Sequence, residues 1–116
     1  MGAARLGMRV WDIPPGRLCR NHLLGEHSEL HAIWSILTKG KRGYSRHPEV
    51  LRWKGKLKAL YLVHEQIASE MIRRGYSHAS PLQEKLATGS GVQDEKVDSV
   101  ADQIRNLRGK RCDCDV

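Results

Sequence analysis

Aromatic side chains are scarce in this 116-residue sequence, which has three Trp, three Tyr and no Phe. Strands are enriched in aromatic and β-branched residues, so a core drawn mainly from Leu, Ile, Val and Ala favours helices over a β-sandwich. Acidic side chains are also few: 13 Asp and Glu stand against 20 Lys and Arg, for a net charge of +7. Such an excess of positive charge is typical of proteins with a polyanionic partner.

Long hydrophobic runs are missing as well. No stretch reaches the roughly 18 apolar residues that a membrane span needs, and residues 1–20 lack the apolar segment of a secretory signal. We therefore expect a cytoplasmic protein with no membrane partner. The three cysteines, two of them at Cys112 and Cys114, do not make the disulfide framework of a secreted domain.

Metal binding is disfavoured by the same count of cysteines. Six histidines and the Cys112-x-Cys114 pair raise the alternative of a metal-dependent interaction protein. One vicinal pair, however, does not supply four ligands at the spacing of a zinc finger. We expect reduced thiols, no metal site and no cofactor.

Helical periodicity predicts an all-α fold in a single domain covering residues 1–116. Apolar stripes indicate a first helix over about residues 17–38, a second over about 56–74 and a shorter third over 97–107, with Gly40, Gly75 and Gly109 as their stops. A basic loop covers residues 40–47, Pro48 opens a short helix, and residues 77–94 form a long loop. We expect a compact, monomeric bundle of about three helices.

Positive charge is concentrated in the first two thirds of the chain. Residues 1–76 carry 14 basic and 6 acidic side chains, whereas residues 77–116 carry 6 and 7. Between residues 39 and 58 a single acid, Glu49, stands among eight basic side chains: Lys39, Lys41, Arg42, Arg46, Arg52, Lys54, Lys56 and Lys58. A solvated loop and helix face would explain this basic cluster, and so would binding to DNA phosphates.

Three polar residues share one face of the first predicted helix. At roughly 100° per residue, His22, Glu26 and Glu29 fall within one sector of the helix. Glu26 lies inside the apolar stripe, where a carboxylate must be paired or protonated. His64 lies in the apolar face of the second helix, and we predict that it pairs with Glu26. Glu29 is either a surface acid or part of an acid-base site.

Three strings carry a resemblance to a known family. HLLGEHSEL at residues 22–30 is followed by TKGKRGYSRHP and then by ASEMIRRGY at residues 68–76. In order and spacing, residues 9–76 resemble the pyrimidine-dimer DNA glycosylases, while residues 77–116 stay largely unmatched. The resemblance implies a bundle of three helices. It also implies an enzyme that removes a damaged pyrimidine base from double-stranded DNA and cleaves the abasic site by β-elimination.

The resemblance also assigns roles to residues. It places the catalytic glutamate at Glu29, the arginine beside the reactive amine at Arg9 and the first-helix histidine at His22, and it puts the basic cluster on the DNA backbone. The nucleophile of the family is an N-terminal α-amine, which forms an imine with the sugar. A non-catalytic, basic DNA-binding helical protein is the main alternative reading of this sequence.

The position of the reactive amine follows from the same resemblance. At pH 7 about a tenth of an α-amine is unprotonated, against less than about a thousandth of a lysine, so the terminus is the better nucleophile. Met8 takes the place of the amine-bearing residue, yet residues 1–7 precede it as a patternless extension. Either the active form begins at Met8, or the amine of Gly2 folds back into the site.

Overall fold

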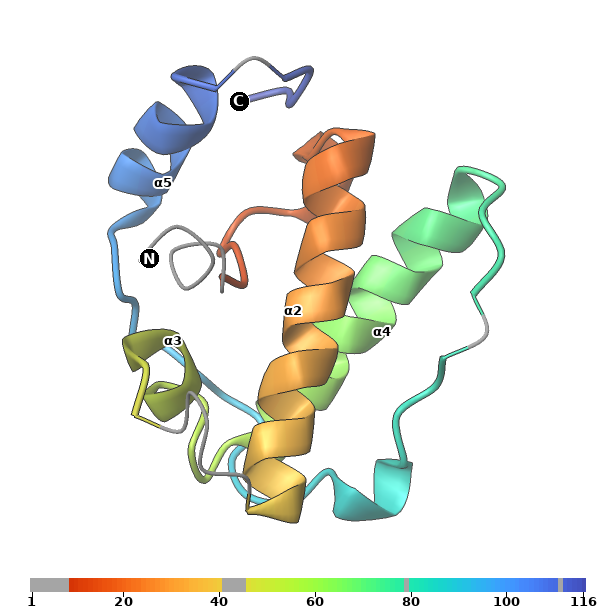
Figure 1. Ribbon diagram of the computed structural model, residues 1–116, viewed down its shortest axis with the longest axis vertical. Coiled ribbons are helices and arrows are strands. Elements are labelled where there is room, and N and C mark those ends of the chain that lie inside the picture. Colours follow the sequence, from red (N-terminus) through yellow and green to blue (C-terminus); the bar gives the residue numbers. More distant parts are fainter. Residues whose placement is uncertain (1–8, 41–45, 79, 111) are drawn as a thin grey trace.

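The computed structural model describes residues 9–40, 46–78, 80–110 and 112–116. These ranges contain the helices α2 (Arg20–Lys39), α3 (Pro48–Leu51), α4 (Leu57–Arg73) and α5 (Val100–Arg108), with the 3-10 turns η1 (Pro15–Arg17) and η2 (Glu84–Leu86) (Figure 1). They contain no strand, only an isolated bridge between Lys56 and Gly89. The all-α prediction is confirmed. None of the described helices is long and apolar enough to cross a membrane.

The ends of the two long helices follow from proline and glycine chemistry. The first helix begins at Arg20 rather than near residue 17, because the turn η1 starts at Pro15 and ends at Leu18 in extended backbone. Gly40 ends α2 at φ 66°, and Gly75 follows α4 at φ 87°. Glycine reaches positive φ without a Cβ clash, as the sequence predicted for both stops.

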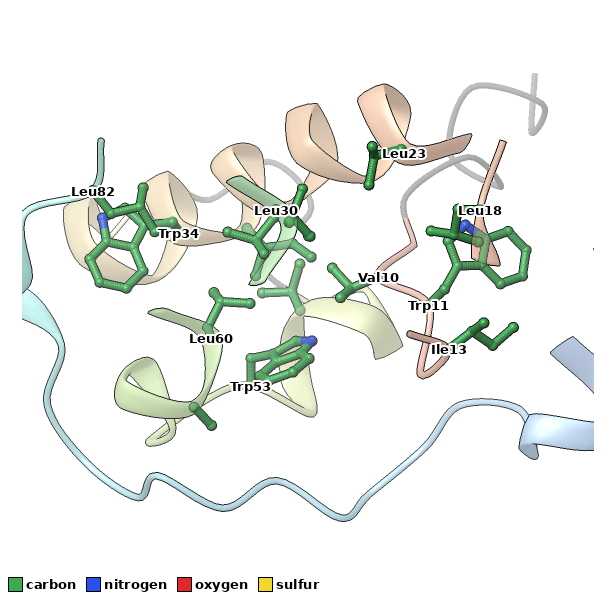
Figure 2. Packing of buried hydrophobic residues seen from close by; sticks show 14 of the residues in the cluster. Val10, Trp11, Ile13, Leu18, Leu23, Leu30, Trp34, Trp53, Leu60 and Leu82 are labelled. Atoms are coloured by element: carbon green, nitrogen blue, oxygen red, sulfur yellow. The ribbon is translucent and has the colours of Figure 1, made fainter. Parts of the chain in front are cut away.

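The hydrophobic core lies between α2 and α4, which pack side by side, and the N-terminal segment closes one end of it (Figures 1 and 2). The predicted stripes supply its centre, with these fully buried members: Leu23, Leu30, Ile33, Leu60 and Ile67. Burying each such side chain contributes about 1.5–3 kcal/mol. The third stripe is shorter than predicted: Val97 is 45% exposed, and α5 begins only after Ser99, whose side chain accepts a hydrogen bond from the main-chain N–H of Asp102.

The predicted long loop of residues 77–94 has regular contacts over residues 80–94. They carry η2 and then run along the beginning of α4, where Thr88 and Ser90 accept hydrogen bonds from the N–H groups of Lys58 and Ala59. These two N–H groups have no partner within the helix, so the returning chain satisfies them. Beyond this contact the chain turns towards α5 (Figure 1).

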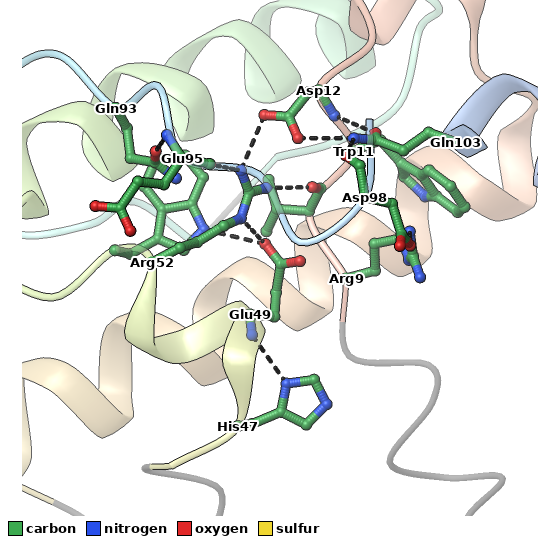
Figure 3. Close-up of polar contacts among 12 residues, drawn as sticks. Arg9, Trp11, Asp12, His47, Glu49, Arg52, Gln93, Glu95, Asp98 and Gln103 are labelled. Carbon is green, nitrogen blue, oxygen red and sulfur yellow. Dashed lines mark hydrogen bonds and ion pairs between the residues drawn. The ribbon is translucent and has the colours of Figure 1, made fainter. Parts of the chain in front are cut away.

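A buried guanidinium holds the N-terminal segment against α3. Arg52 is 5% exposed, and its Nε donates to Glu49 at 2.6 Å. Its other nitrogens donate to the Asp12 carboxylate at 3.0 Å and to the carbonyl oxygens of Val10 at 2.7 Å and Glu95 at 2.9 Å (Figure 3). Three segments therefore meet at one side chain: the N-terminal segment, α3 and the stretch that precedes α5.

The α5 helix is joined to this network through Asp12. Gln103 of α5 donates to the Asp12 carboxylate at 2.9 Å and accepts from the main-chain N–H of Asp12 at 2.8 Å. Asp98, just ahead of α5, pairs with Arg9 at 2.9 Å. The N-terminal segment thus lies between α3 and α5 and is bonded to both.

We expect Arg52→Met to lower the free energy of unfolding by about 3–5 kcal/mol, because it leaves the buried Glu49 carboxylate without its cation. Lys54→Met is the matched control: it removes one positive charge from an exposed position two residues away and should stay within about 0.5 kcal/mol of wild type. Urea denaturation followed by circular dichroism measures both. Equal stabilities for the two variants would contradict the role of Arg52.

Candidate active site

A cavity of about 490 Å³ opens beside the first half of α2. Three parts of the chain line it, namely the N-terminal segment, α2 and the end of α5: Arg9, Trp11, Asn21, His22, Gly25, Glu26, Glu29, Asn106 and Lys110. Its volume lies within the range of sites that hold small organic ligands, about 300–1,000 Å³. The predicted common face of His22, Glu26 and Glu29 is confirmed, since all three side chains line this cavity.

Gly25 keeps the floor of the cavity open. It lies in the interior of α2, where glycine costs about 1 kcal/mol relative to alanine. A Cβ atom added at Gly25 would have no neighbour within 4 Å, so packing does not demand a glycine here. The glycine instead leaves space between His22 and Glu29, one turn away on either side.

Glu29 is the half-buried carboxylate of the site. Burial raises its pKa, while the nearby His47 acts in the opposite direction. Arg9, on the N-terminal segment, also lines the cavity; it is fixed by its ion pair with Asp98, and its guanidinium lies 4.8 Å from the centre of the Trp11 ring. A base and a cation are thus held on two different walls.

Glu26 lies deeper than Glu29. It is 2% exposed, and its Oε2 accepts a hydrogen bond from the main-chain N–H of Trp11 at 2.9 Å. Burial raises the pKa of Glu26 well above its usual value, with the hydrogen bond from Trp11 opposing. This contact ties the N-terminal segment to α2 and so sets the position of Arg9 beside the cavity.

The predicted pairing of Glu26 with His64 is wrong. Glu26 Oε1 and His64 Nε2 each lack a hydrogen-bond partner in the part of the chain that the structure describes, and His64 Nδ1 lies 2.8 Å from Glu65. The apolar stripes of two helices suggested that their two buried polar groups would meet. The N-terminal segment supplies the partner of Glu26 instead, because an unpaired main-chain N–H is a strong donor.

The raised pKa of Glu26 has a consequence for stability. A group whose pKa is higher in the folded state stabilises the fold fully below its unfolded pKa, near 4.5, and loses that contribution as pH rises through the folded pKa. We expect Glu26→Gln to remove this decline, so that the stability of the variant relative to wild type increases between about pH 5 and pH 8. Urea titrations across this range, with the exposed Glu84→Gln as control, measure the difference. A difference that does not change with pH would contradict a raised pKa.

Asn106 and Lys110 are site residues that the sequence analysis missed. They come from the C-terminal part of the chain, which returns to the beginning of α2 (Figure 1). There the N–H of Asp115 donates to the Arg17 carbonyl at 2.7 Å, and Arg17 Nε donates to the Asp115 carbonyl at 2.7 Å. No local pattern reports a contact between residues almost a hundred positions apart.

Cys19 and His22 also meet the C-terminal tail. His22 Nδ1 lies 3.2 Å from the sulfur of Cys19 and 3.3 Å from that of Cys114. Burial and the nearby Lys110 lower the pKa of His22. Cys112 completes a group of four potential metal ligands. The expectation of too few ligands was wrong, because it considered only cysteines adjacent in sequence.

The basic cluster divides into exposed and engaged side chains. Arg52 is buried in the network described above, so its predicted DNA contact is corrected to a structural role. Lys56 pairs with Glu95 at 2.9 Å. The exposed members are Lys39, Arg46, Lys54 and Lys58. Lys41 and Arg42 lie outside the described residues, as does Met8.

The cavity holds carboxylates beside a cation, and basic side chains are exposed on the same molecule; both features are typical of enzymes that act on nucleic acid. The profile of the pyrimidine dimer DNA glycosylase family matches residues 8–84, more than half of the chain. The chain belongs to this family and is a DNA repair glycosylase, which confirms the resemblance seen at residues 9–76. No curated protein and no solved structure matches the chain.

Proposed function

We propose that this protein removes damaged pyrimidine bases from double-stranded DNA and then cleaves the abasic site by β-elimination, through an imine between a protein amine and the sugar. The observation that carries the proposal is the cavity lined by both Glu29 and Arg9. Both residues lie within the span that matches the family. The cavity offers room for a nucleotide extruded from the duplex.

The chemistry assigns a role to each wall. The amine displaces the base from C1′, and the sugar ring opens to give an imine. Glu29 then takes a proton from C2′, the electron pair forms a C2′–C3′ double bond, and the bond from C3′ to the phosphate oxygen breaks. Half-burial raises the pKa of Glu29 and so makes its carboxylate a stronger base than an exposed one. The carboxylate also stabilises the positive charge on the imine.

The proposed nucleophile is the α-amine, which lies outside the described residues. Arg9 would lower the pKa of an amine placed beside it, because a neighbouring cation disfavours the protonated form. Lys110 is the amine that lines the cavity in the described part of the chain. The α-amine remains the better nucleophile, since its unprotonated fraction near neutral pH exceeds that of lysine by more than about a hundredfold.

We expect duplex DNA with one abasic site to be cleaved without added magnesium and to be trapped on the protein by borohydride. Glu29→Gln should slow cleavage by about 10²–10⁴-fold, because an amide takes no proton, while DNA affinity stays unchanged. The control Glu84→Gln changes an exposed carboxylate on η2 in the same way and should cleave normally. Single-turnover gels and filter binding give the two quantities.

Three outcomes would contradict parts of this proposal. Cleavage that needs magnesium, or the absence of any adduct, would contradict the imine. DNA binding with neither cleavage nor adduct would favour a non-catalytic DNA binder. Normal cleavage by Glu29→Gln would remove Glu29 from its role. Mass spectrometry of the trapped peptide locates the reacting amine, and an adduct on Lys110 would contradict the α-amine as nucleophile.

The exposed basic side chains give a second test. If Arg46 and Lys54 contact phosphates, replacing both with Ala should reduce the slope of log K against log salt concentration by about 0.9 per lost contact. The control replaces Lys85 and Lys96, which are exposed outside the basic cluster. Fluorescence anisotropy with undamaged duplex DNA measures the slopes. Equal slopes for both double variants would assign the cluster to a solvated surface.

A further inference from the structure

Four metal-ligating side chains from opposite ends of the chain meet at the beginning of α2. Cys19 and His22 come from the first turn of the helix, and Cys112 and Cys114 come from the C-terminal tail. One ligand atom from each lies within 4.8 Å of all the others. The main-chain N–H of Cys19 also points at the sulfur of Cys114, at 3.0 Å.

The distances fit a tetrahedral metal. Zinc bonds of about 2.3 Å to sulfur and 2.0–2.1 Å to nitrogen place neighbouring ligand atoms roughly 3.5–3.8 Å apart. The two nitrogen-sulfur separations at His22, 3.2 and 3.3 Å, are already close to this value. A thiol is a weak hydrogen-bond donor and acceptor, so hydrogen bonding alone gives little reason for three thiols to gather around one imidazole.

We propose that Cys19, His22, Cys112 and Cys114 bind a zinc ion. Binding releases the thiol protons to solvent and leaves the sulfurs as thiolates, towards which the N–H of Cys19 is directed. Four protein ligands complete the coordination and leave no open position, so this zinc is structural. His22 is accordingly a metal ligand rather than the catalytic residue that its match to the first-helix histidine of the family implies.

The proposed zinc fastens one wall of the active-site cavity. Lys110 and Asn106 precede the Cys112–Cys114 pair, and Leu107 and Gln103 are the α5 residues that are fully buried. Because α5 buries one apolar side chain fully, Leu107, hydrophobic packing alone fixes its position only weakly. A metal that joins the tail to α2 supplies a cross-link between residues 95 positions apart.

A second group of potential metal ligands, made of four histidines, lies on another face of α2. His27 and His31 of α2 meet His64 of α4 and His78 of the following segment, with ring centres 4.6–5.4 Å apart. The Nε2 atoms of His27 and His78 are 3.1 Å apart. Those of His31 and His64 are buried without a partner among the described residues, an arrangement that costs about 1–3 kcal/mol per atom unless something binds them.

The geometry points to a divalent transition metal, zinc by its preference for imidazole, at the Nε2 atoms of these four histidines. Glu65 supports this assignment because its carboxylate lies 2.8 Å from Nδ1 of His64, which turns Nε2 towards the other three rings. A carboxylate behind a metal-bound imidazole is a common second partner. This site would join α2, α4 and the segment that leaves α4.

Cobalt titration of the full, reduced and metal-free chain tests both sites. We expect two cobalt ions per chain, one of them giving the near-ultraviolet absorption of cobalt-thiolate bonds, and displacement of both by zinc. Cys114→Ser should abolish the thiolate absorption and remove one ion, while His78→Gln should remove the other ion and keep that absorption. Each variant is the control for the other, because the retained site shows that the chain has folded.

The outcomes separate the proposals. A reduced wild-type chain without the cobalt-thiolate absorption, or an absorption that persists in Cys114→Ser, would overturn the cysteine site. An unchanged cobalt count in His78→Gln would overturn the histidine site. Because the measurement is metal binding and not DNA cleavage, neither result bears on the glycosylase proposal.

Discussion

The requirement to satisfy one buried guanidinium organises the part of the molecule that carries the candidate site. Arg52 follows directly after the short helix α3 and does not line the cavity. Its bonds to Val10 and Asp12 nevertheless fix the backbone of the N-terminal segment. Residues 9–14, the described part of that segment ahead of η1, form no helix or strand. Its position beside α2 is therefore set by side chains that bond to its main chain, Arg52 on one side and Glu26 on the other.

The same constraint explains why a helical protein of this size has its candidate site at a junction of loops and helix ends. α2 and α4 make the rigid centre, and α2 presents Glu29 from that centre. Arg9 and Lys110 are brought to it by segments that depend on polar contacts. Hydrophobic packing of α2 thus positions Glu29, whereas segments held by polar contacts position Arg9 and Lys110.

The sequence predicted what depends on near neighbours. Helical periodicity located α2 and α4 within a few residues, and glycine predicted where they end. Spacing along α2 placed His22, Glu26 and Glu29 on one face. Contacts between residues far apart in the sequence were not predicted. Arg52 was counted as a surface charge, because a count of charges contains no information on burial. Cys19 and Cys114 are far apart in sequence, so no spacing rule relates them.

The histidine cluster also combines a contact that sequence spacing predicts with one that it does not. His27 and His31 are one turn apart on α2, a spacing at which two histidines can bind the same metal ion. Only the packing of α4 against α2 brings His64 to them. The family match ends at residue 84, so the wall that carries Asn106 and Lys110 lies outside the matched span.

The crossing of Gly89 over Gly55 has a consequence for chain length. An atom added at the Cβ position of Gly89 would lie 2.2 Å from the carbonyl oxygen of Gly55, and Gly89 has φ 80°. The crossing therefore accepts one register of the returning chain, since a shift by one position would bring Thr88 or Ser90 into a space that holds no side chain. The arm from residue 91 to α5 therefore starts at a fixed point beside the beginning of α4, and its length limits how far α5, with the cavity wall that carries Asn106, can lie from α2.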